Sequence, residues 1–194
     1  MTVKVGLAGT HSTGKSTFLD ALNVRLTNDG VRVGRIGDLA TAARARGFPI
    51  LTQHNFESTL WIMAEGMRQE AEATLTSDVI LVDRPVFDAL GYLYAALQIS
   101  GRALPEPKID GLRRIAEACA IDYDIVILTE LDESVGLGEG RDENHAFRVA
   151  AGEQIAAIAQ ASGLTPLALT SSNSGKMLEV VHKKILTSLG RALQ

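Results

Sequence analysis

Residues 9–17 read GTHSTGKST and lie between an apolar run and a helical pattern. The run before them, VKVGLA at residues 3–8, is short and rich in β-branched residues, as expected for a buried strand. The segment after them repeats apolar residues at helical spacing, namely Phe18, Leu19, Leu22 and Leu26. The sequence therefore predicts a tight loop that joins a strand to the start of a helix.

This loop fits the phosphate-binding pattern Gly-x-x-x-x-Gly-Lys-Ser. Its glycines let backbone N–H groups approach an anion, and the following helix adds the positive end of its dipole. Lys15 supplies a cation for the outer phosphates, and the Ser16 hydroxyl is suited to Mg²⁺. The alternative is a turn that only caps a helix. We expect ATP to be bound by Gly9, Thr10, His11, Ser12, Thr13, Gly14, Lys15, Ser16 and Thr17, with Mg²⁺ as a second cofactor.

The composition favours one domain over residues 1–194, with 46% hydrophobic and 22% charged residues. The formal net charge of −4 argues against a general nucleic-acid surface. No apolar run has the length of a membrane span and no signal-peptide pattern is present, so no membrane partner is expected. Cys119 is the single cysteine, which excludes an internal disulfide and favours a cytoplasmic protein.

Apolar strands alternate with helical patterns along the rest of the chain. We expect strands at 31–36, 78–83, 124–131 and 164–170, and helices at 38–46, 55–74, 86–99, 143–160 and 175–193. A further short helix is expected after the Pro-rich connection at 101–108 and runs through Cys119. This alternation predicts an α/β fold, a P-loop NTPase three-layer sandwich with a mostly parallel central sheet. A Gly-rich segment at about 132–148 is predicted to be a mobile lid. Ligands of such sheets lie off the carboxyl ends of the strands.

Asp83 and Arg84 end the most apolar strand pattern. A carboxylate there can hold Mg²⁺ or orient an acceptor hydroxyl, and the adjacent Arg can bind a phosphate. The alternative is that Asp83 caps the next helix, with Pro85 at its first position. We predict that both residues are catalytic and that Asp83 is a metal ligand.

Asp38 follows the second strand pattern and is a candidate proton acceptor for the attacking hydroxyl. It is also a good helix N-cap, and the sequence leaves open whether Asp38 or Asp83 is the base. Arg44, farther along the same helical pattern, is either a substrate contact or a solvated side chain.

Arg141 and Arg148 lie seven residues apart, so on a helix they share one face. Two cations on a closing lid would neutralise charge on the transferring phosphoryl group, and the lid would exclude water. The alternative is an ordinary charged helix face beside Asp142 and Glu143. We predict the catalytic lid.

The guanine-reading Asn-Lys-x-Asp sequence of signalling GTPases and the Leu-Ser-Gly-Gly-Gln signature of transport ATPases are both missing. A small kinase remains. The segments GTHSTGKST (9–17), GDLATAARARGFPI (37–50), ILVDRPVFDALGYL (80–93) and GRDENHAFR (140–148) resemble those of small P-loop kinase-like proteins related to the nicotinamide riboside kinase domain, in the AAA-type ATPase-like family. The chain is more distantly similar to thymidylate and deoxynucleoside kinases.

The resemblance implies ATP with Mg²⁺ and transfer of the γ-phosphoryl group to a nucleoside, a nucleotide or a similar small ribosyl acceptor. This chain departs from the family pattern in one respect, because many relatives carry Glu where this chain has Asp38. Some members of the family are phage enzymes that phosphorylate hydroxymethylated bases in DNA. The acceptor therefore does not follow from the motifs alone.

Acceptor contacts are expected between the second and third strands and after Asp83. Candidate residues are Asp38, Arg44, His54, Phe56, Arg84 and Phe87, whereas Trp61 is expected in the core. After the last strand, Ser172 and Asn173 are expected to contact adenine through the backbone, or else to form a turn and helix cap.

Three hypotheses follow. The first is a kinase for a small nucleoside-like acceptor. The second is a kinase acting on DNA, which requires a basic strip such as Arg102, Lys108, Arg113 and Arg114 and is disfavoured by the acidic total charge. The third is an ATPase switch that senses nucleotide and controls a protein partner. A homodimer is compatible with each of them.

Overall fold

A computed structural model describes residues 2–131 and 144–191 of the chain. Its centre is a five-stranded sheet with the order β2-β3-β1-β4-β5, and every pair of neighbouring strands is parallel. The strands are β1 (Val3–Ala8), β2 (Val33–Ile36), β3 (Val79–Asp83), β4 (Ile125–Thr129) and β5 (Leu167–Leu169). The predicted α/β fold with a parallel sheet is confirmed.

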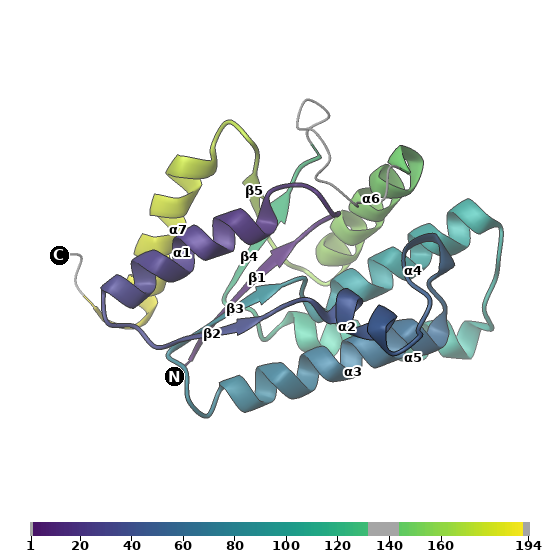
Figure 1. The fold of residues 1–194 in the computed structure, drawn as a ribbon, viewed down its shortest axis with the longest axis horizontal. Coiled ribbons are helices and arrows are strands. Elements are labelled where there is room, and N and C mark those ends of the chain that lie inside the picture. Colours follow the sequence, from purple (N-terminus) through teal and green to yellow (C-terminus); the bar gives the residue numbers. More distant parts are fainter. Residues whose placement is uncertain (1, 132–143, 192–194) are drawn as a thin grey trace.

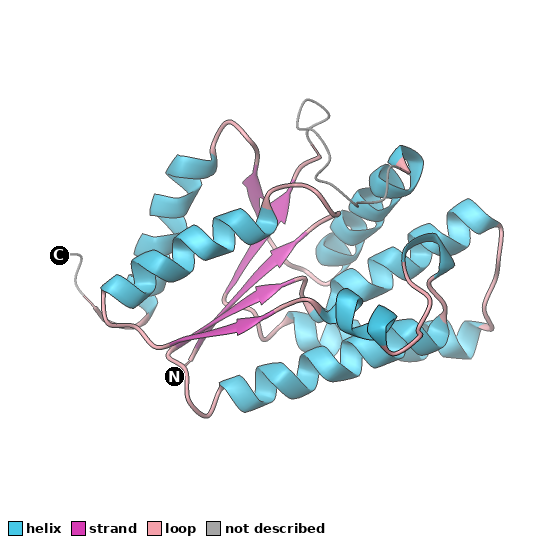
Figure 2. Cartoon of the chain, in the orientation of Figure 1, coloured by secondary structure: helices cyan, strands magenta, loops and turns pink. Residues whose placement is uncertain are grey.

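Helices cover both faces of this sheet (Figures 1 and 2). One face packs against α1 (Lys15–Asn28) and α7 (Ser174–Ser188). On the other face lie α3 (Phe56–Ala73), α4 (Val86–Ser100), α5 (Glu106–Ala120) and α6 (His145–Ala161). The short helices α2 (Leu39–Ala45) and η1 (Leu51–Gln53) lie between β2 and α3, and η1 is not predicted by the sequence pattern.

Two apolar cores separate the sheet from its helices, which explains why the strands read as continuous apolar runs. Along β3, Val79 and Leu81 belong to the core under α1 and α7, whereas Ile80 and Val82 belong to the opposite core. Alternate residues of a strand point to opposite faces, so a sheet covered on both sides needs apolar residues at every position.

The strand register brings the predicted site to one edge of the sheet. Leu7 of β1 pairs with Asp83 of β3, so the phosphate loop begins beside the Asp83 carboxylate. Ile36 of β2 pairs with Val82, which places Asp38 just beyond the same edge. Across residues 2–131 and 144–191, no helix is long and apolar enough to cross a membrane.

Candidate functional site

The phosphate loop is bounded by Gly9 and Gly14, which have φ values of 124° and 81°. Glycine adopts these torsions without strain. A β-carbon on Gly9 would lie 2.2 Å from Thr129 Oγ1, so the first position excludes any side chain. Gly14 is the N-cap of α1 and has no side-chain cap hydrogen bond. The first backbone N–H groups of α1 therefore face the loop without a side-chain cap.

Lys15 lies at the first position of α1 and is 5% exposed. Its ammonium donates to the Thr10 carbonyl and to Thr13 Oγ1, the latter at 3.1 Å. The cation is thus held inside the curve of the loop, where the loop pattern places phosphates.

Ser16 and Asp83 are brought together as a cation site requires. The Ser16 hydroxyl donates to Asp83 Oδ2 at 3.0 Å. Asp83 Oδ1 is buried and has no hydrogen-bond partner among the described residues. One hydroxyl and a carboxylate with a spare oxygen are ligands that suit Mg²⁺, so the residues fit that ion.

A cavity of about 310 Å³ opens in front of the phosphate loop. Its wall includes the loop from His11 to Thr17, together with Asp38, Arg44, Asp83 and Arg84. The structure therefore places these predicted residues around one space. Their roles in binding and catalysis stay predictions.

Asp38 precedes α2 in a left-handed conformation, with φ of 57°, and is exposed. Its side chain makes no cap hydrogen bond to α2, so a helix cap does not account for this residue. Within residues 2–131 and 144–191, the non-glycine residues with positive φ all line the same cavity: Ser12, Asp38, Leu51 and Arg84. Strained backbone of this kind clusters at functional sites.

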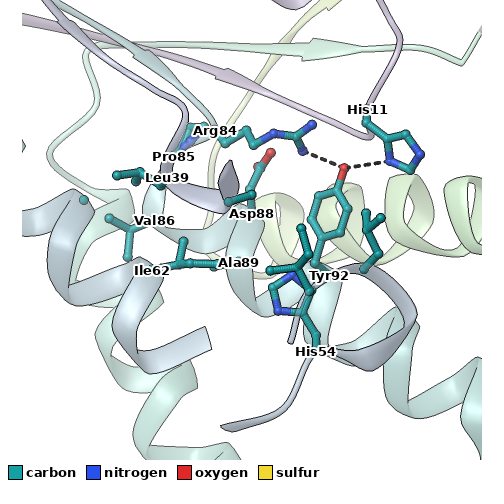
Figure 3. A pocket seen from close by; sticks show the side chains of 14 residues that line it. His11, Leu39, His54, Ile62, Arg84, Pro85, Val86, Asp88, Ala89 and Tyr92 are labelled. Carbon is teal, nitrogen blue, oxygen red and sulfur yellow. Dashed lines mark hydrogen bonds between the residues drawn. The ribbon is translucent and has the colours of Figure 1, made fainter. Parts of the chain in front are cut away.

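A second, apolar cavity of about 70 Å³ adjoins the first (Figure 3). It lies between α2, η1, α3 and α4, and its apolar wall includes Leu39, Ile50, Leu51, Ile62, Val86 and Ala89. His11 and Arg84 line both cavities. The two cavities are therefore neighbours that share part of their lining.

His54 lies in the wall of the apolar cavity and is 3% exposed. Its Nδ1 is 3.2 Å from the Ser58 hydroxyl, at the start of α3. Burial lowers the pKa of His54 to about 4, and the positive charges of Arg84 and Arg102 act in the same direction. The imidazole is therefore neutral at pH 7.

Asp88 was not predicted as a site residue, and for Tyr92, which follows the Asp83-Arg84 motif, the sequence leaves open an acceptor contact or a core position. Asp88 Oδ2 accepts a hydrogen bond from the Gly9 N–H at 3.1 Å, and the Tyr92 hydroxyl accepts one from Arg84 Nη1 at 2.6 Å. Burial raises the pKa of Asp88, although Arg84 and Lys15 act against it. The only sequence signal is their four-residue spacing in a helix that directly follows Asp83.

On the other side of the phosphate loop lies a hollow of about 280 Å³ between α1 and the turn after β5. Thr170, Ser171 and Ser174 line it, together with Glu130. Asn173 instead closes the turn, because its side chain accepts from Thr170 N–H at 3.0 Å and donates to the Ala168 carbonyl at 2.9 Å. The turn thus reaches the loop, while the adenine contact of Ser172 and Asn173 stays a prediction.

Of the predicted lid, Arg141 and most of the segment lie outside the described residues. Arg148 lies in the first turn of α6 and is 5% exposed. Its Nε and Nη2 are buried without a hydrogen-bond partner among the described residues. A buried cation with unused donors is consistent with an anion site, and its catalytic role stays a prediction.

Phe56 and Phe87 lie away from the cavities near the phosphate loop. Phe87 is fully buried in the core, with its ring edge-on to Tyr123. Phe56 lines a groove between α3 and α5, under the ammonium of Lys108. Trp61 was expected in the core but is partly exposed, stacked on Phe48 with 5.6 Å between ring centroids.

Two side chains of the basic strip required by the DNA hypothesis pair with carboxylates of this chain. Lys108 pairs with Glu57 at 3.3 Å, and Arg113 pairs with Asp110 at 2.8 Å. Arg102 donates to the backbone carbonyls of Thr52 and His54. Lys108 and Arg113 are therefore paired within the chain, while the DNA acceptor stays a hypothesis.

Comparisons with known proteins agree with this architecture. The model of the AAA domain family matches residues 4–174. The fold is similar to that of NadR protein in complex with NR, with a TM-score of 0.68 and 12% identity. It is also similar to NadR protein in complex with NAD and AMP-PNP, with a TM-score of 0.65 and 13% identity. Both alignments cover 100% of this chain but 53% and 51% of the NadR chains, so this chain spans about half of their length.

Deoxyadenosine kinase from M. mycoides with bound dATP has a TM-score of 0.64 and 12% identity. That alignment covers 94% of this chain and 99% of the kinase. A search of curated proteins gave no match. The structural similarities show the fold, and the comparisons together confirm the predicted relation to P-loop kinase-like proteins.

Proposed function

This chain belongs to the AAA domain family, and we propose that it works there as an ATP- and Mg²⁺-dependent kinase that transfers the γ-phosphoryl group to a small nucleoside-like acceptor. The observation that carries the proposal is the junction of two cavities. The polar cavity in front of the phosphate loop and the apolar cavity beside α4 meet at His11 and Arg84. A kinase needs such a pair of sites, one for the triphosphate and one for the acceptor.

Each part of the polar cavity has a task in this proposal. Lys15 and the loop N–H groups bind the phosphates, while Ser16 and Asp83 hold Mg²⁺, which shields the phosphate charge. Arg148, at the start of α6, supplies a further cation to the transferring group. The α-helix dipole of α1 adds to the same positive field.

Asp38 is the favoured proton acceptor, because Asp83 is already occupied with Ser16. The acceptor hydroxyl oxygen forms a bond to the γ-phosphorus as the bond from that phosphorus to the β,γ-bridging oxygen breaks. The hydroxyl proton passes to Asp38, and ADP leaves. An exposed carboxylate free of a cap contact can reach the hydroxyl without disturbing α2.

The apolar cavity favours an uncharged acceptor ring over a phosphorylated one. Its wall is mostly apolar, the guanidinium of Arg84 donates to the Gly9 carbonyl and the Tyr92 hydroxyl, and His54 is neutral at pH 7. Burying a phosphate among these apolar side chains would be unfavourable. A nucleoside is therefore preferred to a nucleoside monophosphate as the acceptor.

The test measures ADP release from Mg·ATP with a panel of acceptors. The panel contains ribonucleosides, deoxynucleosides, their monophosphates, nicotinamide riboside, and plain and hydroxymethylated DNA, with Lys15→Ala as the blank. Stimulation by a nucleoside that the blank abolishes is the expected result. Steady ATP hydrolysis that no acceptor changes would overturn the kinase proposal in favour of a nucleotide-sensing ATPase.

A further inference from the structure

Helix α4 contacts the phosphate loop at two points. Asp88 and Tyr92 are four residues apart, so both lie on the same face of the helix. Asp88 Oδ2 accepts from the Gly9 N–H at 3.1 Å, and the Tyr92 hydroxyl lies 3.3 Å from His11 Nδ1. The first and third residues of the loop are thus tied to one helix.

Arg84 joins the two contacts into one network (Figure 3). Its Nη1 donates to the Gly9 carbonyl at 3.3 Å and to the Tyr92 hydroxyl at 2.6 Å. Both polar backbone groups of Gly9 are therefore bound by side chains of the segment that follows β3. The guanidinium of Arg84 also lies over the Tyr92 ring, 4.9 Å from the ring centroid.

The loop is confined on its opposite side by β4. Thr129 Oγ1 donates to the Ala8 carbonyl at 3.2 Å and lies 2.7 Å from Thr13 Oγ1. The same atom blocks the space beside Gly9. Because β4 confines one side of the loop, contacts from α4 on the other side determine where Gly9 sits.

We propose that Asp88 and Tyr92 form a clamp, the α4 clamp, that holds the phosphate loop in its phosphate-binding conformation. Both are positioning residues that act through Gly9 and His11. The inference rests on the proposed nucleotide site, because its measured effect is on triphosphate binding. It adds to that function a role for two side chains that the motif does not contain.

The chemistry of Asp88 supports a role beyond folding. Its carboxylate is 1% exposed, and Oδ1 has no hydrogen-bond partner among the described residues. A buried, half-satisfied carboxylate is costly to a fold and is more readily explained by a local task. Burial raises the pKa of Asp88 to about 7, and Oδ2 accepts from the Gly9 N–H whether or not the carboxyl carries a proton.

The clamp also lines the proposed acceptor site. Asp88 and Tyr92 line the apolar cavity, and His11, which Tyr92 contacts, lines both cavities. The position of the loop and the shape of the acceptor cavity are therefore set by the same two side chains.

The test compares Asp88→Leu, Asp88→Asn and Tyr92→Phe with the unaltered chain. Asn keeps an oxygen that accepts from Gly9, whereas Leu fills similar space without one. Tyr94→Phe is the matched control, because it removes a tyrosine hydroxyl from the side of α4 that faces Arg113. Three quantities are measured: affinity for Mg·AMP-PNP by calorimetry, hydrogen exchange of the amides of residues 9–14 in nucleotide-free protein, and the thermal midpoint.

Loss of the hydrogen bond from the Gly9 N–H should weaken Mg·AMP-PNP binding about tenfold in Asp88→Leu. Exchange at residues 9–14 should accelerate in that variant, while the thermal midpoint stays constant or rises, because a buried carboxyl oxygen with no partner among the described residues is removed. The affinity of Asp88→Asn for Mg·AMP-PNP should stay within about threefold of that of the unaltered chain. The affinity of Tyr92→Phe should lie between those of Asp88→Asn and Asp88→Leu. Tyr94→Phe should change neither affinity nor exchange.

Unchanged affinity and exchange in Asp88→Leu would overturn the clamp. A loss of affinity that only tracks a lower thermal midpoint in every variant would also overturn it, in favour of a folding role. If the unaltered chain binds no nucleotide, the proposed function fails instead, and the exchange measurement still decides the clamp.

Discussion

The hydroxyl of Ser16 donates to Oδ2 of Asp83 at 3.0 Å, although 67 positions separate the two residues in the chain. This contact joins the first turn of α1 to the end of β3. It aligns a hydroxyl and a carboxylate beside the phosphate loop, with Asp83 Oδ1 still lacking a partner in the described part of the chain. The pair supplies some of the oxygen ligands that Mg²⁺ needs, and the phosphate oxygens of a bound nucleotide would supply others.

Asp83→Asn should remove the Mg²⁺ dependence of nucleotide binding. The amide keeps the shape but loses the charge that holds a divalent cation. We expect EDTA to weaken AMP-PNP binding to the unaltered chain by about tenfold or more, and to have little effect on the variant. Calorimetry with and without Mg²⁺ checks this, with Asp110→Asn on α5, which lines neither cavity near the phosphate loop, as the control. A variant that still gains affinity from Mg²⁺ would remove Asp83 from the metal site.

Asp38→Asn should lower kcat and leave stability nearly unchanged. The side chain makes no cap contact to α2, so the free energy of unfolding should move by less than about 0.5 kcal/mol. Loss of the proton acceptor should reduce kcat by about a hundredfold or more, with the KM for ATP unchanged. Urea unfolding and steady-state kinetics measure the two effects. The reverse pattern, intact kcat with about 1 kcal/mol lost, would mark Asp38 as a helix cap.

Arg148→Met should stabilise the protein and impair transfer. Nε and Nη2 are buried and unpartnered with respect to residues 2–131 and 144–191, so an apolar side chain removes a desolvation cost. We expect the free energy of unfolding to rise by about 1 kcal/mol and kcat to fall at least tenfold. Arg114→Met, on the exposed side of α5, is the control. A variant that loses stability and keeps its activity would make Arg148 a structural residue.

The sequence predicted most of the fold because local chemistry dictates it. The torsions of Gly9 and Gly14 and the charge of Lys15 define the loop. Because β3 is buried on both faces, its residues form one continuous apolar run, which identifies the strand in the sequence. These features depend on neighbours in the sequence, so the pattern alone was sufficient.

The missing parts of the site depend on contacts between distant segments. In the sequence, Asp88 does not differ from other carboxylates in the first turn of a helix. Only the fold brings the Gly9 nitrogen to 3.1 Å from its Oδ2. Phe87 and Trp61 show the same limit, because an aromatic residue on a helix fits a core or a cavity equally well. The structure buries Phe87 fully and leaves Trp61 stacked on Phe48.

His54 should make stability fall as the solution is acidified. Its folded pKa of about 4 lies below the ordinary histidine value of 6.5, so the unfolded chain takes up a proton first. The stability is therefore fully present above pH 6.5 and is lost as the pH falls toward 4. Urea unfolding at pH 7 and pH 5 should show a loss roughly 2 kcal/mol larger in the unaltered chain than in His54→Asn.

Equal losses of stability in the unaltered chain and in His54→Asn would mean that folding does not shift the pKa of His54. The imidazole would then be protonated at mildly acidic pH in the native state, beside Arg84 and Arg102. Protonated His54 would add a second positive charge to the wall of the apolar cavity. The site would then prefer anionic acceptors over uncharged ones near pH 5. The ratio of nucleoside to nucleoside monophosphate turnover across this pH range separates the two cases.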